Sequence, residues 1–128
     1  MNAPAPSLPK EFLRSALLLL LREEPAHGYE LIERVGALGV DSADAGGIYR
    51  ALRRLEEEGL VKSAWEHSAV GPQRRIYQIT REGMSELHRR ARAIAGGQRH
   101  VAAFLARYQE FVALHARATE PATAARRR

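Results

Sequence analysis

GGIYRALRRLEEEGLVKSAWE, residues 46–66, is the stretch of sequence that decides the fold. Two glycines, which disfavour a helix, are followed by three arginines and then by three glutamates. On a helical wheel Ile48, Leu52 and Leu55 share one side, which predicts that this side packs against other helices. The opposite side carries Gly46, Arg50, Arg53 and Glu57. The stretch therefore predicts an amphipathic helix, ending at Gly59, whose exposed side is basic first and acidic afterwards.

Two further helices are expected before this one. The first runs from about Lys10 to Glu23, with leucines and other apolar residues at helical spacing, and Pro25 ends it. The second opens at His27 and Gly28, runs to about Leu38, and is stopped by one of two glycines, Gly36 or Gly39. The helix-capping candidates for the third helix are Asp41, Ser42 and Asp44.

A β-hairpin and one long helix are expected after the third helix. Residues 60–66 and 74–79 read as two strands joined by a polar loop, with the turn marked by Gly71 and Pro72. Trp65 and Tyr77 are expected to pack this hairpin onto the body. Thr80 is expected to cap the last helix. The predicted fold class is mainly α with a small β-hairpin: a winged helix-turn-helix followed by a long C-terminal helix.

Composition limits what the protein can do. The 20 Lys and Arg residues exceed the 15 Asp and Glu residues, giving a net charge of +5 that favours an acidic partner. Absence of cysteine excludes disulfides, cysteine metal sites and a thiol nucleophile, and the scattered histidines show no metal-ligand spacing, so neither metal nor cofactor is expected. The run of leucines at residues 17–21 is too short to span a membrane. We expect a cytoplasmic protein with no membrane partner.

Four segments are expected along the chain. Residues 1–9 form a flexible arm, residues 10–80 the winged helix-turn-helix domain, residues 81–118 a dimerisation helix, and residues 119–128 a flexible basic tail.

In a winged helix-turn-helix the third helix enters the major groove of DNA and the hairpin lies along the backbone or minor groove. A helix N-terminus suits phosphate, and glycines there let a backbone approach closely. The alternatives are a solvated helix with ion pairs such as Arg53 with Glu57, and hairpin arginines that only protect a strand edge. The predicted DNA-binding residues are His27, Tyr29, Ser42, Gly46, Gly47, Tyr49, Arg50, Arg53, Lys62, Arg74 and Arg75.

The last helix carries an apolar stripe that predicts a partner helix. The stripe follows 4-3 spacing without a change of phase at Gly96 and Gly97, which predicts one continuous helix. Packing of the stripe on its own domain is the alternative. The residues predicted to form the dimer seam are Leu87, Ala91, Ile94, Gln98, Val101, Phe104, Leu105, Tyr108 and Val112.

Four motifs together resemble the PadR family of bacterial transcriptional regulators. They are HGYEL at residues 27–31, GGIYRALRRLEEEGLV at 46–61, the tryptophan and Gly-Pro turn of the wing, and RRIYQITREG at 74–83. The resemblance, closest to the smaller subfamily with a single C-terminal helix, implies a homodimeric winged-helix protein, usually a repressor. It further implies that Tyr29 and Tyr49 contact phosphate or brace the second helix against the third, and that a small aromatic effector can bind at the dimer interface in some relatives.

The sequence therefore predicts a homodimeric, sequence-specific DNA-binding transcriptional regulator, a repressor by family resemblance, that recognises a palindromic operator in double-stranded DNA. The alternative is a winged-helix interaction adaptor without specific DNA binding. An enzyme is not expected, because no paired-carboxylate, Ser-His-Asp or phosphate-loop arrangement can be placed on one surface.

Overall fold

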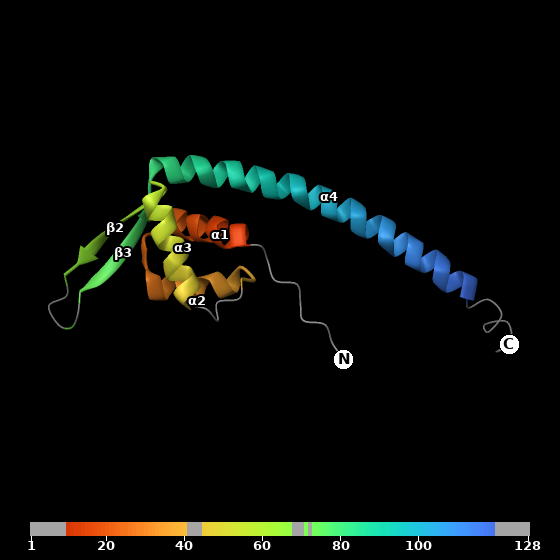
Figure 1. The fold of residues 1–128 in the computed structure, drawn as a ribbon, viewed down its shortest axis with the longest axis horizontal. Coiled ribbons are helices and arrows are strands. Elements are labelled where there is room, and N and C mark those ends of the chain that lie inside the picture. Colours follow the sequence, from red (N-terminus) through yellow and green to blue (C-terminus); the bar gives the residue numbers. More distant parts are fainter. Residues whose placement is uncertain (1–9, 41–44, 68–70, 72, 120–128) are drawn as a thin grey trace. The chain divides into compact units, whose positions relative to one another are not determined.

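The computed structural model describes residues 10–40, 45–67, 71 and 73–119 (Figure 1). The elements in chain order are α1 (Lys10–Glu23), β1 (Ala26–His27), α2 (Gly28–Ala37), α3 (Ala45–Glu57), β2 (Val61–Glu66), β3 (Arg74–Ile79) and α4 (Arg81–Thr119). The predicted arm at residues 1–9 and residues 120–128 of the predicted tail lie outside the described residues. The chain divides into two units, residues 1–91 and 92–128, so the division falls inside α4.

The core of the first unit is built where α1, α2 and α3 meet one face of the sheet. Leu17 and Leu18 of α1, Leu31 of α2 and Leu52 and Leu55 of α3 are all fully buried. This confirms that the apolar side of α3 faces inward, because Ile48 is also only 1% exposed. Burial of apolar side chains from each of these helices is the main source of stability for a domain of this size.

The wing is a sheet of three strands, not the two expected from sequence. β2 and β3 form the predicted hairpin and extend beyond the helices in Figure 1. β1 adds a third strand on the other side of β3, pairing Ala26 with Tyr77 and His27 with Ile76. Two residues are too few to show an alternating pattern, so the sequence carried no strand signal there.

Trp65 and Tyr77 take different environments, although both were expected to pack the hairpin onto the body. Tyr77 is 8% exposed and belongs to the core, as predicted. The prediction for Trp65 is wrong, because its side chain is 57% exposed. Trp65 pairs with Arg75 in the outer part of the hairpin, whereas Tyr77 pairs with β1 at the inner part. The guanidinium of Arg75, with its Cζ 5.2 Å from the ring centroid, covers the Trp65 ring instead of the protein body.

The turn between α3 and the wing begins at Gly59, as predicted. Gly59 has a φ of 78°, which is the left-handed conformation that glycine adopts without strain. The Leu60 N–H donates to Leu55 O at 2.9 Å and the Gly59 N–H to Glu56 O at 3.0 Å, which together form a Schellman motif. Thr80 then joins this turn to α4: its hydroxyl donates to Gly59 O and accepts from the Gly83 N–H at 3.0 Å, confirming the predicted cap.

Gly83 lets the first turn of α4 lie directly on the turn before β2. A Cβ at this position would overlap the Leu60 carbonyl oxygen and lie 2.7 Å from Ile79 Cγ1. We expect Gly83→Ala to lower the free energy of unfolding by roughly 1–3 kcal/mol, because a backbone carbonyl cannot move aside as a flexible side chain can. Urea unfolding at fixed protein concentration measures the change.

Gly96→Ala is the matched control for Gly83→Ala. A Cβ at Gly96 would meet only Arg99 Nη2 at 3.9 Å, an ordinary contact. Alanine favours a helix over glycine by about 1 kcal/mol, so this variant should be as stable as the wild type or more so. Equal effects of the two variants would show that close packing at Gly83 is unimportant.

Candidate nucleic-acid interface

The exposed side of α3 is the surface predicted to read DNA. Arg50 and Arg53 are exposed one turn apart, and Gly46 is exposed at the first turn. Gly47 is partly buried. Because Ile48, Leu52 and Leu55 hold the opposite side in the core, the orientation of both arginines toward solvent is fixed by the packing of the helix.

Tyr49 joins the start of α3 to the start of α2. Its side chain is 44% exposed, and a Cβ added at Gly28 would lie 2.9 Å from the Tyr49 hydroxyl oxygen. The absence of a side chain at Gly28 therefore makes room for the Tyr49 ring. This contact matches the bracing role that the family resemblance implies for Tyr49.

Arg74 comes together with His27 and Tyr29, although it is 45 residues from Tyr29 in sequence. The rings of His27 and Tyr29 are stacked, with centroids 5.5 Å apart and planes at 12°. Arg74 Nη1 donates to the Tyr29 hydroxyl at 3.1 Å, and Arg74 Cζ lies 5.9 Å from that ring's centroid. The partner of Arg74 in this contact is an uncharged phenol, so the contact positions the guanidinium without neutralising it.

His27 fixes the junction between β1, α2 and β2. It is the N-cap residue of α2, and its backbone N–H donates to Glu30 Oε1 at 2.8 Å. This hydrogen bond is the main reason that the pKa of Glu30 is lowered. The ring nitrogens of His27 lie 2.9 Å from Glu30 Oε1 and 3.2 Å from Glu66 Oε1. His27 thus ties the end of β2 to the start of α2.

The structure separates Lys62 and Arg75 from the group around Arg74. Lys62 pairs with Gln78 near the base of the hairpin, four residues along β3 from Arg74, so it is not part of the basic wing tip. Arg75 lies on the other face of the sheet from Arg74, because successive strand residues point to opposite faces. Its Nε donates to Ser63 Oγ at 2.8 Å. Ser42 lies outside the described residues.

The acidic end of α3 has structural partners that sequence reasoning missed. Glu58 forms an ion pair with Arg14 of α1, and Glu56 Oε2 accepts a hydrogen bond from Ser63 Oγ at 2.7 Å. Arg14 and Glu58 are 44 residues apart, so no local spacing pattern could reveal the pair. These contacts attach α3 to α1 and to the wing.

We expect Glu58→Gln to lower the melting temperature at pH 7 and to have a smaller effect at acidic pH. The hydrogen bond from Arg14 holds the pKa of Glu58 below its ordinary value. Such a carboxyl stabilises the fold above its unfolded pKa of about 4.3, and this contribution is lost as pH falls through the folded pKa. Melting curves from pH 7 to pH 3 measure the difference, with Glu57→Gln as the control. A difference that stays constant with pH would contradict the ion pair.

Arg90 joins the first part of α4 to α1. Its Nη1 donates to Glu11 Oε2 at 2.7 Å and its Nε to Glu86 Oε2 at 2.7 Å. The pKa of Glu11 is lowered by the hydrogen bond from Arg90, and that of Glu86 mainly by Arg89. The spacings of Glu86 with Arg89 (i,i+3) and with Arg90 (i,i+4) are the local sequence signals for this group. Leu87 packs beside it against the core of the first unit.

In the second unit α4 runs through Gly96 and Gly97 without interruption, which confirms one continuous helix. The large apolar side chains of the predicted dimer seam in this unit are between 42% and 67% exposed. They are Ile94, Val101, Phe104, Leu105, Tyr108 and Val112. Contiguous exposed apolar stripes of this kind are typical of surfaces that contact a protein or a membrane.

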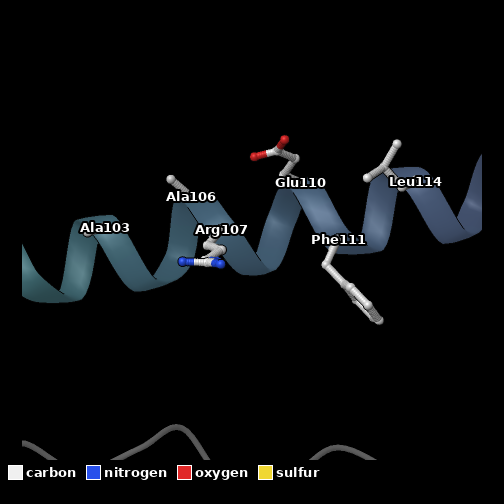
Figure 2. Close-up of a pocket in the computed structure, with 6 residues that line it drawn as sticks. All are labelled: Ala103, Ala106, Arg107, Glu110, Phe111 and Leu114. Atoms are coloured by element: carbon white, nitrogen blue, oxygen red, sulfur yellow. The ribbon is translucent and has the colours of Figure 1, made fainter.

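A shallow hollow lies on the same stretch of α4 as the apolar stripe. It is lined by Ala103, Ala106, Arg107, Glu110, Phe111 and Leu114. Figure 2 shows Ala106, Glu110 and Leu114 on one side of the helix and the Phe111 ring projecting on the other. These residues belong to one helix, so within this unit the hollow is an open surface and not an enclosed cavity.

Three packed helices, a three-stranded wing and an exposed basic helix define a winged helix-turn-helix protein. Residues 17–89, more than half of the 128 residues, match the model of the transcriptional regulator PadR-like family. The chain belongs to this family of transcriptional regulators, as the sequence motifs predicted. No helix among the described residues is long and apolar enough to cross a membrane.

Solved structures of family members share the fold. A PadR family transcriptional regulator from Eggerthella lenta is 31% identical, with 74% of this chain and 86% of that chain covered and a TM-score of 0.62. A PadR-like transcriptional regulator from Bacillus cereus is 28% identical, with 75% and 93% covered and a TM-score of 0.67. Bacillus subtilis PadR, solved in complex with operator DNA, is 28% identical, with 62% and 46% covered and a TM-score of 0.56. Among curated proteins there is no match.

Proposed function

We propose that this chain is a homodimeric, sequence-specific DNA-binding transcriptional repressor. The observation that carries the proposal is the exposure of Arg50 and Arg53 on a helix whose other side is locked into the core. A cation on such a helix can be presented to base edges or phosphates at a fixed depth in the major groove. The solved complex of Bacillus subtilis PadR with operator DNA supports this use of the fold.

The wing supplies the second part of the proposed interface. Arg74 is exposed near the outer end of β3 and is oriented by Tyr29. A basic side chain at this place suits contact with the sugar–phosphate backbone beside the groove that α3 enters. Phosphate contacts set the position of the protein on the duplex, whereas contacts from α3 to base edges specify the sequence.

The exposed stripe of α4 supports the proposed dimer. Side chains such as Leu105 and Val112, each 45% exposed, would be removed from water by a second copy of the helix. A twofold dimer presents two α3 helices, so the operator should contain two inverted half-sites. Occupation of such a site within a promoter by the dimer is the physical basis of the proposed repression.

A gel-shift assay with DNA from upstream of the protein's own gene tests the proposal. The protein should give a saturable shift that resists unrelated competitor DNA, and affinity should fall steeply when salt is raised from 50 to 200 mM, by about 10³-fold for six phosphate contacts. A reporter driven by the same DNA should be less active when the protein is present. Absence of a saturable shift at low salt would favour the adaptor alternative. Increased reporter activity would show that the protein activates transcription and does not repress it.

A further inference from the structure

We propose that Arg75 is a positioning residue, which together with Ser63 and Glu56 sets the orientation of the wing relative to α3, and that it is not a phosphate contact. These three residues are called the wing brace below. The inference deepens the proposed function, because it assigns different roles to the two neighbouring arginines of the wing.

The brace connects three elements through the side chains of its members. Arg75 Nε on β3 donates to Ser63 Oγ on β2 at 2.8 Å, and Ser63 Oγ donates to Glu56 Oε2 on α3 at 2.7 Å. Arg75 Nη2 also lies 4.0 Å from the same Glu56 oxygen. Glu56 Oε2 of α3 therefore anchors residues from both strands of the hairpin.

Trp65 completes the surroundings of the Arg75 guanidinium. Arg75 and Trp65 are cross-strand partners on the same face of the hairpin, and Arg75 Cζ lies 5.2 Å from the Trp65 ring centroid. The guanidinium thus has an aromatic face beside it, a hydroxyl acceptor at Nε and a carboxylate near Nη2. A planar cation with these neighbours is held in one orientation and is partly neutralised by Glu56.

Arg74 provides the contrast within the same strand. Its partner Tyr29 is an uncharged phenol, and its side chain lies on the opposite face of the sheet. Arg74 has Tyr29 and its cross-strand partner Glu66 of β2 as neighbours, whereas the guanidinium of Arg75 is directed to Glu56 of α3. Strand alternation places the two arginines on opposite faces, but their order does not reveal the partners Tyr29 and Glu56, which are far away in sequence.

The brace matters because the wing and α3 must contact one duplex at the same time. The pairing of β1 with β3 fixes the inner end of the hairpin at Tyr77. The brace fixes β3 at Arg75, two residues farther out along the strand. Loss of the brace should let the outer hairpin change its angle to α3, which would weaken the wing contacts without removing a phosphate contact.

Glu56→Gln gives the sharpest test, because the two interpretations predict opposite signs. Removal of a negative charge near DNA strengthens binding if Glu56 is only an acidic neighbour, whereas loss of the brace weakens it. We expect Glu56→Gln, Ser63→Ala and Arg75→Gln each to weaken operator binding by about 5- to 20-fold, the effect of losing one or two hydrogen bonds. Glu57→Gln, an equal charge change on the exposed side of α3, is the control and should not weaken binding.

The dependence of binding on salt separates a positioning role from a phosphate contact. The slope of log affinity against log salt should be unchanged in Arg75→Gln, whereas loss of one phosphate contact would reduce it by about 0.9. Arg75→Lys keeps the charge but cannot keep the planar contacts, so it should bind as weakly as Arg75→Gln. The proposal is overturned if Arg75→Lys binds like the wild type, if the slope falls by about one, or if Glu56→Gln strengthens binding.

Trp65 reports on the brace without DNA, because it is the only tryptophan in the chain. Glu56→Gln and Ser63→Ala leave Trp65 itself unchanged, but each removes a contact of the brace that holds Arg75 against the Trp65 ring. Both variants should therefore increase the quenching of Trp65 fluorescence by acrylamide. Circular dichroism confirms that each variant is folded. If the wild type bound no operator but acrylamide quenching rose in the Glu56→Gln and Ser63→Ala variants, the proposed DNA-binding function would be wrong. The structural role of the brace would still be supported. Unchanged quenching in folded Glu56→Gln protein would overturn the brace itself.

Discussion

Replacement of both Arg50 and Arg53 with alanine is expected to abolish specific operator binding under conditions where the wild type binds tightly. Each arginine that reads a base contributes about 1–3 kcal/mol of discrimination, so the double variant should lose at least about 100-fold in affinity. If these residues contact phosphates instead, affinity will fall on all DNA sequences alike and the salt slope will decrease by about two. Titrations of the operator and of a scrambled duplex at two salt concentrations distinguish these cases.

The control for this experiment removes the same charge elsewhere. Arg92 and Arg99 are exposed on α4, away from the apolar stripe, and their double alanine variant also lowers the net charge by two. Its affinity should remain within a few-fold of the wild type, since distant surface charges act only through screened long-range fields. Equal losses in the two double variants would show that α3 does not form the binding surface.

Replacement of Val101 and Leu105 with glutamate is expected to convert the proposed dimer into monomers. Their side chains are 57% and 45% exposed in the single chain, and in a dimer they would face a second helix. Four carboxylates brought together in a twofold apolar seam would be too costly to bury. Light scattering coupled to size exclusion should therefore report about half the wild-type mass.

The same variant should bind the operator at least about 100-fold more weakly, because each half-site would be bound without the gain from linkage. Ala103→Glu combined with Ala106→Glu adds the same charge on the other side of the helix and is the matched control. This control should remain dimeric and bind normally. A monomeric wild type would refute the dimer, and a dimeric Val101→Glu/Leu105→Glu variant would place the interface elsewhere.

The elements of this fold could be predicted from sequence because each has a local signal. Regular leucine spacing marks α1, Gly59 ends α3, and Thr80 begins α4, and the structure confirms these positions. The family was likewise evident from motifs that combine helix caps, core positions and turn residues in one order. Such signals operate over a few residues and do not require knowledge of the folded chain.

The contacts within the candidate site could not be predicted, because they join residues far apart in sequence. Arg14 meets Glu58 and Tyr29 meets Arg74 only after the helices have packed. The glutamates at the end of α3 oppose the helix dipole, so local sequence alone predicts that they destabilise the helix. Their partners on α1 and the wing show why they are stabilising in this fold. Trp65 was misjudged for a related reason: an aromatic residue in a strand favours burial, but a cation from the next strand covers it here.

The short strand β1 gives the wing its cooperativity. Ala26 of β1 pairs with Tyr77 of β3, about fifty residues later in the sequence, and both residues belong to the core. The complete three-stranded sheet therefore forms only after this long loop closes, whereas the pairing of β2 with β3 is local. Local unfolding of the wing base would also expose the core residues Ala26 and Tyr77, so we expect the base to open less readily than a surface loop.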